Sequence, residues 1–278
     1  MNKQVLVVLA MVLMVMGCNS TPTDSQTLNA NLPYSDIIEQ PYRIAPASQS
    51  YGKDKLQRIY YWPTAEQPRT IMVFIHGGCW LNAYDYTHAR GLFTALAKQG
   101  VATFAIEYRR TGDEGGGWPG SLNDINQALP KIKQWIDKDL PQNVPVYLAG
   151  HSAGGHLALL AAQSVTFPVE GVIGLAAITD PVSYAQGDNS CQTATPLFFN
   201  GTPEEQPQAY AAATPTTQQI VAEVTLLQGD ADAIVPLSQS ELVGSKPIIV
   251  AGAGHFDWLH QHTAAYQQLL NVLNKGAR

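Results

Sequence analysis

The chain has 278 residues, of which 45% are hydrophobic, and this is enough to form one substantial core. The formal net charge is −6 and no long run of one sign occurs, so the sequence predicts no nucleic-acid partner. We therefore expect a single folded domain, preceded by the N-terminal segments described next.

The first 17 residues have the features of a secretory leader. Lys3 supplies a positive charge, and the apolar stretch at 5–16 is too short to span a bilayer comfortably. The stretch ends in Val15-Met16-Gly17-Cys18, which resembles the lipobox of bacterial lipoproteins. The resemblance implies cleavage after Gly17, a lipid on Cys18 and a place on the periplasmic face of the cell envelope. Because Asn19 rather than Asp follows the cysteine, the outer membrane is favoured over the inner one; an ordinary secretory signal is the alternative.

Residues 18–40 are predicted to form a flexible tether, because their Ser, Thr, Asn, Gln and Pro content cannot supply a core. The folded domain is expected over 41–278. Cys79 and Cys191 lie within that domain. In an oxidising compartment they could pair, or they could remain two separate buried thiols, and the sequence leaves both readings open.

From about residue 41, apolar strand-like runs alternate with helical patterns. We predict strands at 59–62, 70–75, 101–106, 144–149, 172–177, 224–228 and 247–251, and helices at 86–99, 121–138, 156–162 and 263–275. The second of these helices is expected to start from Ser121 as its N-cap. Buried strands that alternate with helices predict an α/β fold with a doubly wound, mostly parallel sheet.

The segment 181–217 interrupts this alternation and is rich in proline and aromatic residues. Long insertions inside compact domains usually have a function, so we expect a small cap over the functional site. An irregular surface loop is the alternative. Trp80, Phe198 and Phe199 could line the pocket beneath such a cap, or could belong to the core.

The most informative motif is Gly150-His151-Ser152-Ala153-Gly154, which lies between a predicted strand and a predicted helix. In this context the pattern G-x-S-x-G is typical of a sharp turn that presents a serine hydroxyl to a substrate, with glycines where backbone segments approach closely. We therefore predict that Ser152 is a nucleophile. His151, inside the turn, is expected to point away from the serine.

A nucleophilic serine needs a base, an acid that orients the base, and donors for the oxyanion. Among seven histidines, His255 is the predicted base because it directly follows the strand at 247–251, whereas His88 is expected on an exposed helix face. Asp230 and Asp232, in the loop after 224–228, are the candidate acids.

The loop His76-Gly77-Gly78-Cys79-Trp80 follows the strand at 70–75. Two adjacent glycines allow backbone N–H groups to turn toward a substrate oxygen. We therefore predict that Gly77 and Gly78 form the oxyanion hole together with the N–H of Ala153. His76 is expected to support this loop rather than to react.

With these parts in this order, the region 57–275 resembles the α/β-hydrolase superfamily. The form His76-Gly77-Gly78-x-Trp80 is similar to its esterase branch, which includes kynurenine-formamidase-like and hormone-sensitive-lipase-like enzymes. Many related hydrolases carry a pattern close to H-G-x-x-D-x-x-V-P, and the resemblance places Asp232 at its acid, with Gln228 in place of the usual His. Asp230 is then a turn residue.

The stretch Glu107-Tyr108-Arg109-Arg110 and the later Asp124 also resemble that branch. The resemblance implies that Arg109 forms a structural ion pair with Asp124 and helps to brace the oxyanion loop, rather than binding substrate.

The sequence therefore predicts a carboxylesterase that acts on small soluble esters through an acyl-enzyme, with the triad Ser152, Asp232 and His255. We expect no metal or organic cofactor, because the His and Asp residues lack metal-ligand spacing. We expect the protein to contact a membrane only through the lipid on Cys18. The alternatives are a kynurenine-formamidase-type amidase, a prolyl-oligopeptidase-like peptidase, and a catalytically silent binding protein on the same scaffold.

Overall fold

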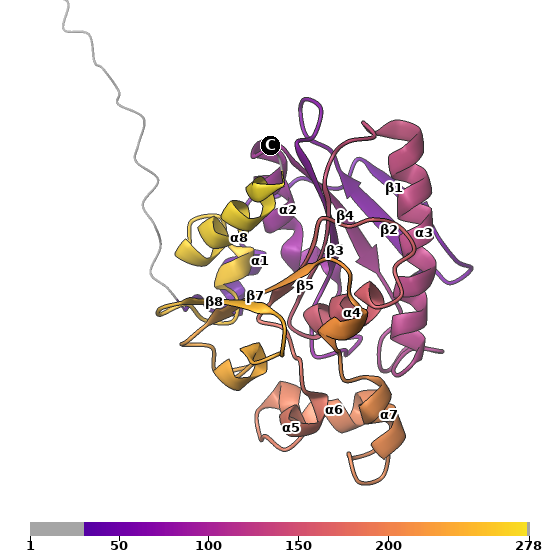
Figure 1. Cartoon of the computed structure of the whole chain (residues 1–278), viewed down its shortest axis with the longest axis vertical. Helices are drawn as coiled ribbons and strands as arrows, with labels where there is room; N and C mark the ends of the chain where they lie inside the picture. The colour runs from indigo at the N-terminus through magenta and orange to yellow at the C-terminus, as the bar shows by residue number, and fades with distance from the viewer. Residues whose placement is uncertain (1–30, 277–278) are drawn as a thin grey trace, which may run out of the picture.

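The computed structural model describes residues 31–276. The predicted signal peptide, the predicted lipidation site Cys18 and the tether up to residue 30 lie outside them. The described residues form one eight-stranded sheet in the order β1-β2-β4-β3-β5-β6-β7-β8 (Figure 1). The first two strands are antiparallel to their neighbours, and all later pairings are parallel. The strands are β1 (Ala47–Ser50), β2 (Arg58–Trp62), β3 (Thr70–Ile75), β4 (Val101–Glu107), β5 (Val146–His151), β6 (Gly171–Leu175), β7 (Glu223–Gly229) and β8 (Lys246–Val250).

Helices cover both faces of the sheet, and strand β3 shows why. Successive side chains on a strand point to opposite faces, and every residue of β3 is buried. One set of β3 side chains packs with helices α3 (Gly120–Asp139) and α4 (Ala153–Ala162), and the other with α2 (Arg90–Lys98) and α8 (Ala264–Lys275). The α/β fold with a doubly wound, mostly parallel sheet is therefore confirmed.

Some element boundaries differ from the sequence-based expectation. Strand β5 ends at His151, two residues later than predicted, so the strand runs directly into the serine turn. Ser121 is not the N-cap of α3; it lies inside the helix, and its hydroxyl donates to the Arg109 carbonyl at 2.7 Å. Strand β1 was not predicted, because its sequence Ala-Ser-Gln-Ser is polar and lies at an exposed sheet edge.

The insertion between β6 and β7 is helical and projects away from the sheet at the lower end of Figure 1. Asn189 and Gln192 form a reciprocal capping box that starts its central helix. The insertion is thus an ordered helical cap rather than an irregular loop. It contains α5 (Pro181–Tyr184), α6 (Ser190–Phe199), α7 (Pro207–Ala212) and the short 3₁₀ helix η2 (Thr217–Gln219). Elsewhere in the described residues, the 3₁₀ helices are η1 (Tyr86–Ala89), η3 (Leu237–Ser240) and η4 (Asp257–Leu259).

Residues 31–40 belong to the folded domain, which corrects the prediction of a tether as far as residue 40. Leu32 and Ile37 are buried, the latter in the short helix α1 (Tyr34–Ile38). The Gln40 side chain donates to the Leu259 carbonyl at 2.9 Å, which joins the end of this segment to η4. Because residues 18–40 are mostly polar, their composition did not reveal the few residues that anchor 31–40 to the domain.

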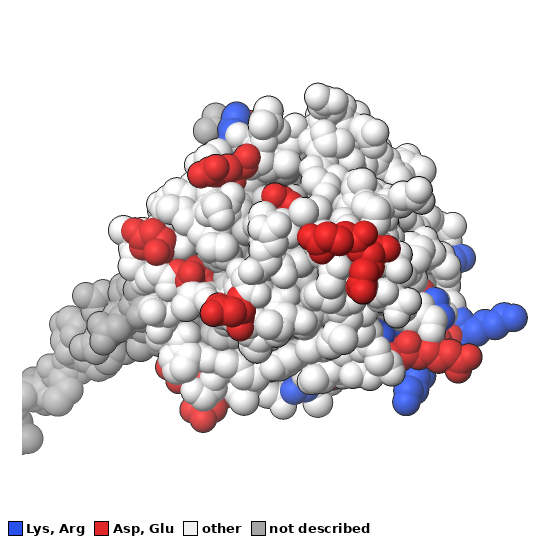
Figure 2. Space-filling model, turned by 90° about the horizontal axis from the view of Figure 1, so that it is seen from below, with Lys and Arg blue, Asp and Glu red and all other residues white. Residues whose placement is uncertain are grey.

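Figure 2 views the molecule from the cap end. Acidic side chains are scattered over this face, and basic ones lie mainly at one edge. This face therefore carries more negative than positive charge, in keeping with the net charge of −6. No helix within residues 31–276 combines the length and the apolar character needed to cross a bilayer.

Candidate active site

Ser152 lies in a sharp turn between β5 and α4, with φ 56° and ψ −123°. A non-glycine residue rarely adopts this backbone conformation, and such strain is typical of functional sites. The surrounding backbone leaves no room for side chains, since a Cβ on Gly150 would lie 2.1 Å from the Gly154 carbonyl oxygen. A Cβ on Gly154 would lie 2.2 Å from the Ile75 carbonyl oxygen. The G-x-S-x-G pattern therefore forms the strand-to-helix turn that the sequence predicted.

His255 and Asp232 lie side by side in the loops that follow β8 and β7. The distance from His255 Nδ1 to Asp232 Oδ2 is 2.8 Å. The other carboxylate oxygen accepts hydrogen bonds from the N–H groups of Ile234 and Val235, both at 2.8 Å. An ionised carboxylate only accepts, so it fixes the hydrogen of a neutral imidazole on Nδ1 and leaves Nε2 as a free base.

Gln228 stands where the related hydrolases usually have histidine, and it supports the candidate acid Asp232. Its side-chain amide donates to the Val235 carbonyl at 3.0 Å and to Asp232 Oδ2 at 3.3 Å. Asp230, the rejected candidate acid, is exposed and accepts from the Gly252 N–H at 2.6 Å. Of the two aspartates in this loop, only Asp232 contacts His255 among the described residues.

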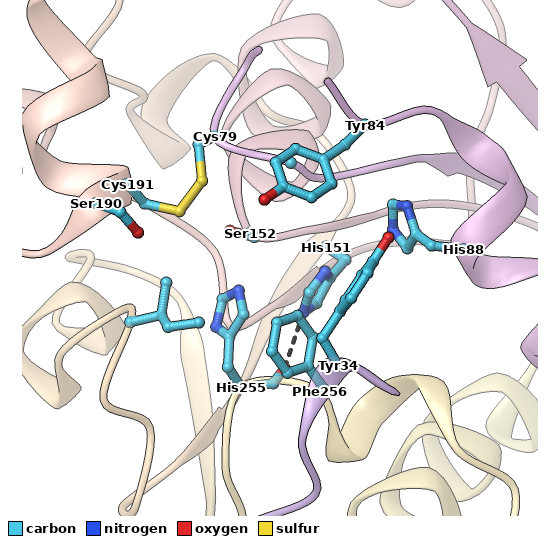
Figure 3. A pocket seen from close by; sticks show the side chains of 12 residues that line it. Tyr34, Cys79, Tyr84, His88, His151, Ser152, Ser190, Cys191, His255 and Phe256 are labelled. Atoms are coloured by element: carbon cyan, nitrogen blue, oxygen red, sulfur yellow. Dashed lines mark hydrogen bonds between the residues drawn. A yellow bond between two sulfur atoms is a disulfide. The ribbon is translucent and has the colours of Figure 1, made fainter. Parts of the chain in front are cut away.

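Ser152 and His255 line the same cavity of about 180 Å³ (Figure 3). In the described structure, no hydrogen bond joins the serine hydroxyl to the imidazole. Such contacts are often long in unliganded hydrolases and tighten when substrate binds. The described residues contain no group of three or more His, Cys, Asp or Glu placed to hold a metal ion. The cavity is lined by Tyr34, Gly78, Cys79, Tyr84, His88, His151, Ser152, Ser190, Cys191, Ile234, His255 and Phe256.

The predicted oxyanion loop passes directly over the serine turn. A Cβ on Gly77 would lie 2.7 Å from the His151 carbonyl oxygen and 3.1 Å from Ser152 Cβ, so only glycine fits there without a shift. Gly78 has φ 113°, a conformation that favours glycine, and lines the cavity. Ala153 is the first residue of α4, where an N–H has no partner within the helix. Gly77 and Ala153 therefore lie next to Ser152, and Gly78 lines the same cavity.

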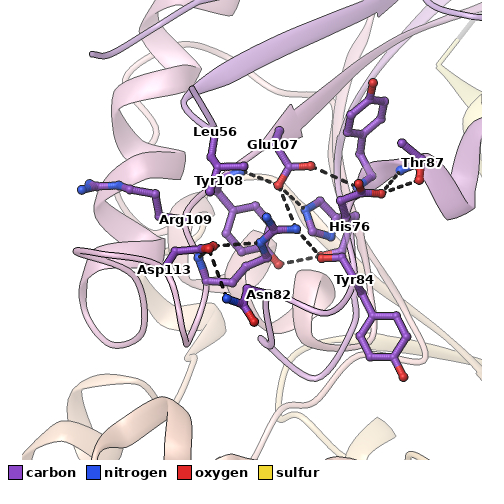
Figure 4. A network of polar contacts seen from close by, with 12 residues as sticks. Leu56, His76, Asn82, Tyr84, Thr87, Glu107, Tyr108, Arg109 and Asp113 are labelled. Atoms are coloured by element: carbon purple, nitrogen blue, oxygen red, sulfur yellow. Dashed lines mark hydrogen bonds and ion pairs between the residues drawn. The ribbon is translucent and has the colours of Figure 1, made fainter. Parts of the chain in front are cut away.

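A buried polar network holds this loop from behind (Figure 4). The Tyr108 hydroxyl donates to the His76 carbonyl at 2.8 Å, and the rings of the two residues stack. The distance from His76 Nε2 to Glu107 Oε1 is 3.3 Å, and Arg110 pairs with the same carboxylate at 3.2 Å. Arg110 also donates to the Tyr84 carbonyl. His76 thus supports the loop, as predicted, whereas the parts of Glu107 and Arg110 were missed.

Arg109 forms the predicted ion pair with Asp124. The guanidinium donates to both carboxylate oxygens, at 2.6 and 2.9 Å, and the Arg109 N–H adds a third bond at 3.0 Å. The Asp124 side chain is fully buried, and its hydrogen bond to the guanidinium raises the pKa of Arg109. This pair fixes the turn after β4 to α3, and the direct contacts to the oxyanion loop come instead from the network around Glu107.

Cys79 and Cys191 form a disulfide, which settles the open question of their pairing. The bond joins the residue after Gly78 to helix α6 of the cap. Beside it, the Trp80 and Phe198 rings stack at 4.9 Å. Trp80, Phe198 and Phe199 are buried and do not line the cavity, so of the two readings that the sequence left open, the core is the correct one. They are the aromatic core between cap and oxyanion loop.

Two further histidines face the cavity, contrary to expectation. His88 is 6% exposed rather than solvated, and burial lowers its pKa to about 3. The His151 ring lies 4.6 Å from the His255 ring, and its Nε2 donates to the His255 carbonyl at 2.9 Å. Burial and the neighbouring His255 hold the pKa of His151 well below its usual value. His151 therefore packs beside the candidate base as a neutral support, and does not point away from the site.

Sequence reasoning missed several residues of the cavity wall. Phe256 could have been found, because it directly follows His255. Tyr84, Ser190 and Ile234 lie in loops or at a helix start without a recognisable motif, and Tyr34 lies in the segment that was predicted to be a tether.

The BD-FAE family model matches residues 58–246, more than half of the chain. The chain belongs to the BD-FAE family. It is similar to Esterase LipC of Mycobacterium tuberculosis, with 28% identity over 121 residues that cover 42% of this chain and 30% of the relative. A match to the Gibberellin receptor GID1B of Arabidopsis thaliana has 33% identity and covers 32% of this chain and 25% of the receptor. The chain thus spans less than a third of either curated relative.

Among solved structures, Esterase B from Lactobacillus Rhamnosis is similar in fold, with a TM-score of 0.70 and 16% identity over 88% of this chain and 90% of that one. This likeness shows the α/β-hydrolase fold. Together with the family match and the esterase relatives, it makes this BD-FAE member an α/β hydrolase of the esterase superfamily.

Proposed function

We propose that this BD-FAE member is a serine carboxylesterase that acts on small esters. The observation that carries the proposal is the Asp232–His255 pair, whose histidine lines one cavity with a serine held at φ 56° beneath a glycine loop. This combination supplies a nucleophile, an oriented base and oxyanion donors, which are the parts that acyl transfer needs.

In the proposed mechanism, His255 Nε2 takes the proton of Ser152 as its oxygen attacks the ester carbonyl. The N–H groups of Gly77 or Gly78 and of Ala153 stabilise the oxyanion. His255 then returns the proton to the departing alcohol, and water hydrolyses the acyl-enzyme by the same route in reverse. Each oxyanion donor is expected to contribute roughly 2.7–4 kcal/mol to transition-state stabilisation.

The size of the cavity supports small substrates. Its volume of about 180 Å³ is below the roughly 300–1,000 Å³ of sites for drug-sized ligands. The disulfide, cap helix α6 and the Tyr84 loop enclose it. We therefore expect short acyl groups to be turned over faster than long ones.

The test is the hydrolysis of p-nitrophenyl acetate by wild-type protein and Ser152→Ala. We expect the variant to lose activity by a factor of about 10⁴ or more while keeping its thermal unfolding midpoint. The control is Ser190→Ala, which removes another cavity-lining hydroxyl that has no proposed chemical role. A Ser152→Ala protein with most of its activity would refute the assignment.

A non-catalytic binding protein on the same scaffold is the alternative from another class, and a receptor does occur among the relatives. Asp232 and His255 are in contact, and Ser152 lines the same cavity as His255. The presence of all three triad residue types favours an enzyme over a binding protein. Labelling of Ser152 by a fluorophosphonate probe decides between the two, because a silent site leaves the serine unlabelled. Assays of formamide and aminoacyl amide substrates beside esters separate the amidase and peptidase readings.

We also propose that Cys18 carries a lipid that holds the enzyme in a bacterial envelope, with the outer membrane favoured. The proposal rests on the sequence Val15-Met16-Gly17-Cys18 and on Asn19 alone. Metabolic labelling with radioactive palmitate should mark the wild-type protein and not Cys18→Ser; equal labelling of both would refute it.

A further inference from the structure

One wall of the cavity comes from the N-terminal segment. Tyr34 starts helix α1, and its ring lies 5.4 Å from Phe256, 5.9 Å from Tyr84 and 6.2 Å from His88. These four residues, which we call the aromatic end of the cavity, come from three parts of the chain: helix α1, the segment 84–88 and the loop after β8. In Figure 3 they lie opposite the Cys79–Cys191 disulfide, with Ser152 and His255 between the two sides.

The aromatic end is positioned by Asp257, which is almost fully buried. Its Oδ1 accepts the Leu32 N–H at 2.7 Å, and its Oδ2 accepts the Asn31 N–H at 2.6 Å. The same Oδ2 accepts the Gly254 N–H at 3.0 Å. One carboxylate therefore joins the backbone just before Tyr34 to the backbone just before His255.

Burying the Asp257 carboxylate costs free energy unless hydrogen-bond donors replace the water that it loses. A buried carboxylate is stable only when its oxygens are satisfied, and here backbone N–H groups of two distant segments do so. Ile37, three residues further along the same short helix, is buried and anchors that helix in the core. The chain is thus anchored on both sides of Tyr34 in sequence, by Asp257 at residues 31 and 32 and by the buried Ile37.

We propose that Tyr34 is a specificity-determining residue that limits the size of the substrate group held at the aromatic end. Asp257 is the positioning residue that holds it there. The proposal rests on the proposed esterase function. It follows from geometry, because removing the Tyr34 ring would lengthen the cavity at that end, whereas an enlarged ring would shorten it.

The experiment compares Tyr34→Ala, Tyr34→Phe and Tyr34→Trp in the full chain, with Tyr42→Ala as the matched control. Tyr42 lies in the same N-terminal segment but is exposed and packs on Arg90 outside the cavity. Two series of esters are assayed: p-nitrophenyl esters of increasing acyl length, and acetates of increasingly large alcohols. They report on the two sides of the scissile bond.

In one of the two series, we expect Tyr34→Ala to raise kcat/KM for the largest ester relative to the smallest by about tenfold. Tyr34→Trp should lower the same ratio, while Tyr34→Phe and Tyr42→Ala should leave it within about twofold. Because the alanine and tryptophan variants act in opposite directions, loss of folding in one of them leaves the other as a test. Folded variants with unchanged ratios in both series would overturn the proposal.

The positioning role of Asp257 is tested in a double-mutant cycle with Asp257→Asn. The new amide would place N–H donors against backbone N–H donors, so the segment around Tyr34 should be released. Asp257→Asn should then shift the ester ratio as Tyr34→Ala does, and the double variant should shift it no further. A purely structural effect on His255 would lower kcat for all esters and leave their ratio unchanged, which would overturn this role.

The failure of this inference differs from a failure of the proposed function. If wild-type protein hydrolyses no ester and does not react with a fluorophosphonate, the esterase assignment is lost. If wild-type protein is active but the ratios do not respond to residue 34, only the role of Tyr34 is lost.

Discussion

The sharpest test of the site is Asp232→Asn, because the change keeps the size of the side chain and reverses one hydrogen bond. Asp232 Oδ1 accepts two backbone N–H groups at 2.8 Å, and an asparagine oxygen can keep both. In the wild-type protein His255 Nδ1 lies 2.8 Å from Asp232 Oδ2, and in the variant the amide nitrogen takes the place of that oxygen. A donor at that position favours the tautomer with hydrogen on Nε2, which cannot accept the proton of Ser152.

We expect this variant to lower kcat for p-nitrophenyl acetate about 10⁴-fold, or roughly 5.5 kcal/mol of activation free energy, with little change in KM. The matched control is Asp230→Asn, two residues away, which touches the Gly252 N–H and not the histidine. Its kcat should stay within about twofold of wild type. If Asp232→Asn retained more than a tenth of the activity, or if Asp230→Asn lost as much, the assignment of the acid would be wrong.

Two predictions concern stability. Asp124→Asn removes the charge from a fully buried partner of Arg109, whose own side chain is 22% exposed, and should cost about 2–3 kcal/mol in the free energy of unfolding by urea titration. Asp137→Asn, in the exposed pair with Lys133 on the same helix, should cost less than about 0.5 kcal/mol; equal losses would contradict the burial argument. Burial lowers the pKa of His156 to about 4, below its unfolded value, so its contribution is present above pH 6.5 and falls away as the pH drops toward 4. At pH 5 the stability lost in this way, relative to neutral pH, is about 2 kcal/mol. His156→Gln should therefore reduce the dependence of the unfolding free energy on pH. An unchanged slope between pH 6.5 and 4.5 would contradict this expectation.

Local sequence rules were sufficient for the parts of the site that depend on backbone space. Gly150 and Gly154 are needed because the turn brings their α-carbons against neighbouring carbonyls, and this requirement is visible in the pattern itself. His255 and the candidate acids Asp230 and Asp232 were found because each follows a strand, and the ends of parallel strands meet at one edge of the sheet. The family resemblance then chose Asp232 over Asp230. These patterns involve residues that are close in the chain, so they can be recognised without knowing how the protein packs.

Long-range packing, in contrast, left little trace in the sequence. For Trp80 the sequence left both a pocket and a core position open, and the structure shows its ring buried against Phe198 of the cap. His88 was expected on an exposed helix face, but the segment that carries Tyr34 covers it. Both outcomes depend on which distant segment packs on the residue, and periodicity within one helix does not contain that information.

The sequence by itself therefore determined the α/β fold, the turn that holds Ser152 and the order of the parts proposed for catalysis, because each depends on residues that are neighbours in the chain. Only the tertiary structure decided the pairing of Cys79 with Cys191 and the walls of the cavity. It also showed that residues 31–40 are part of the domain, since two buried side chains and one distant carboxylate outweigh the polar composition of that segment. Contacts between distant segments are made in three dimensions, so composition and spacing alone could not reveal them.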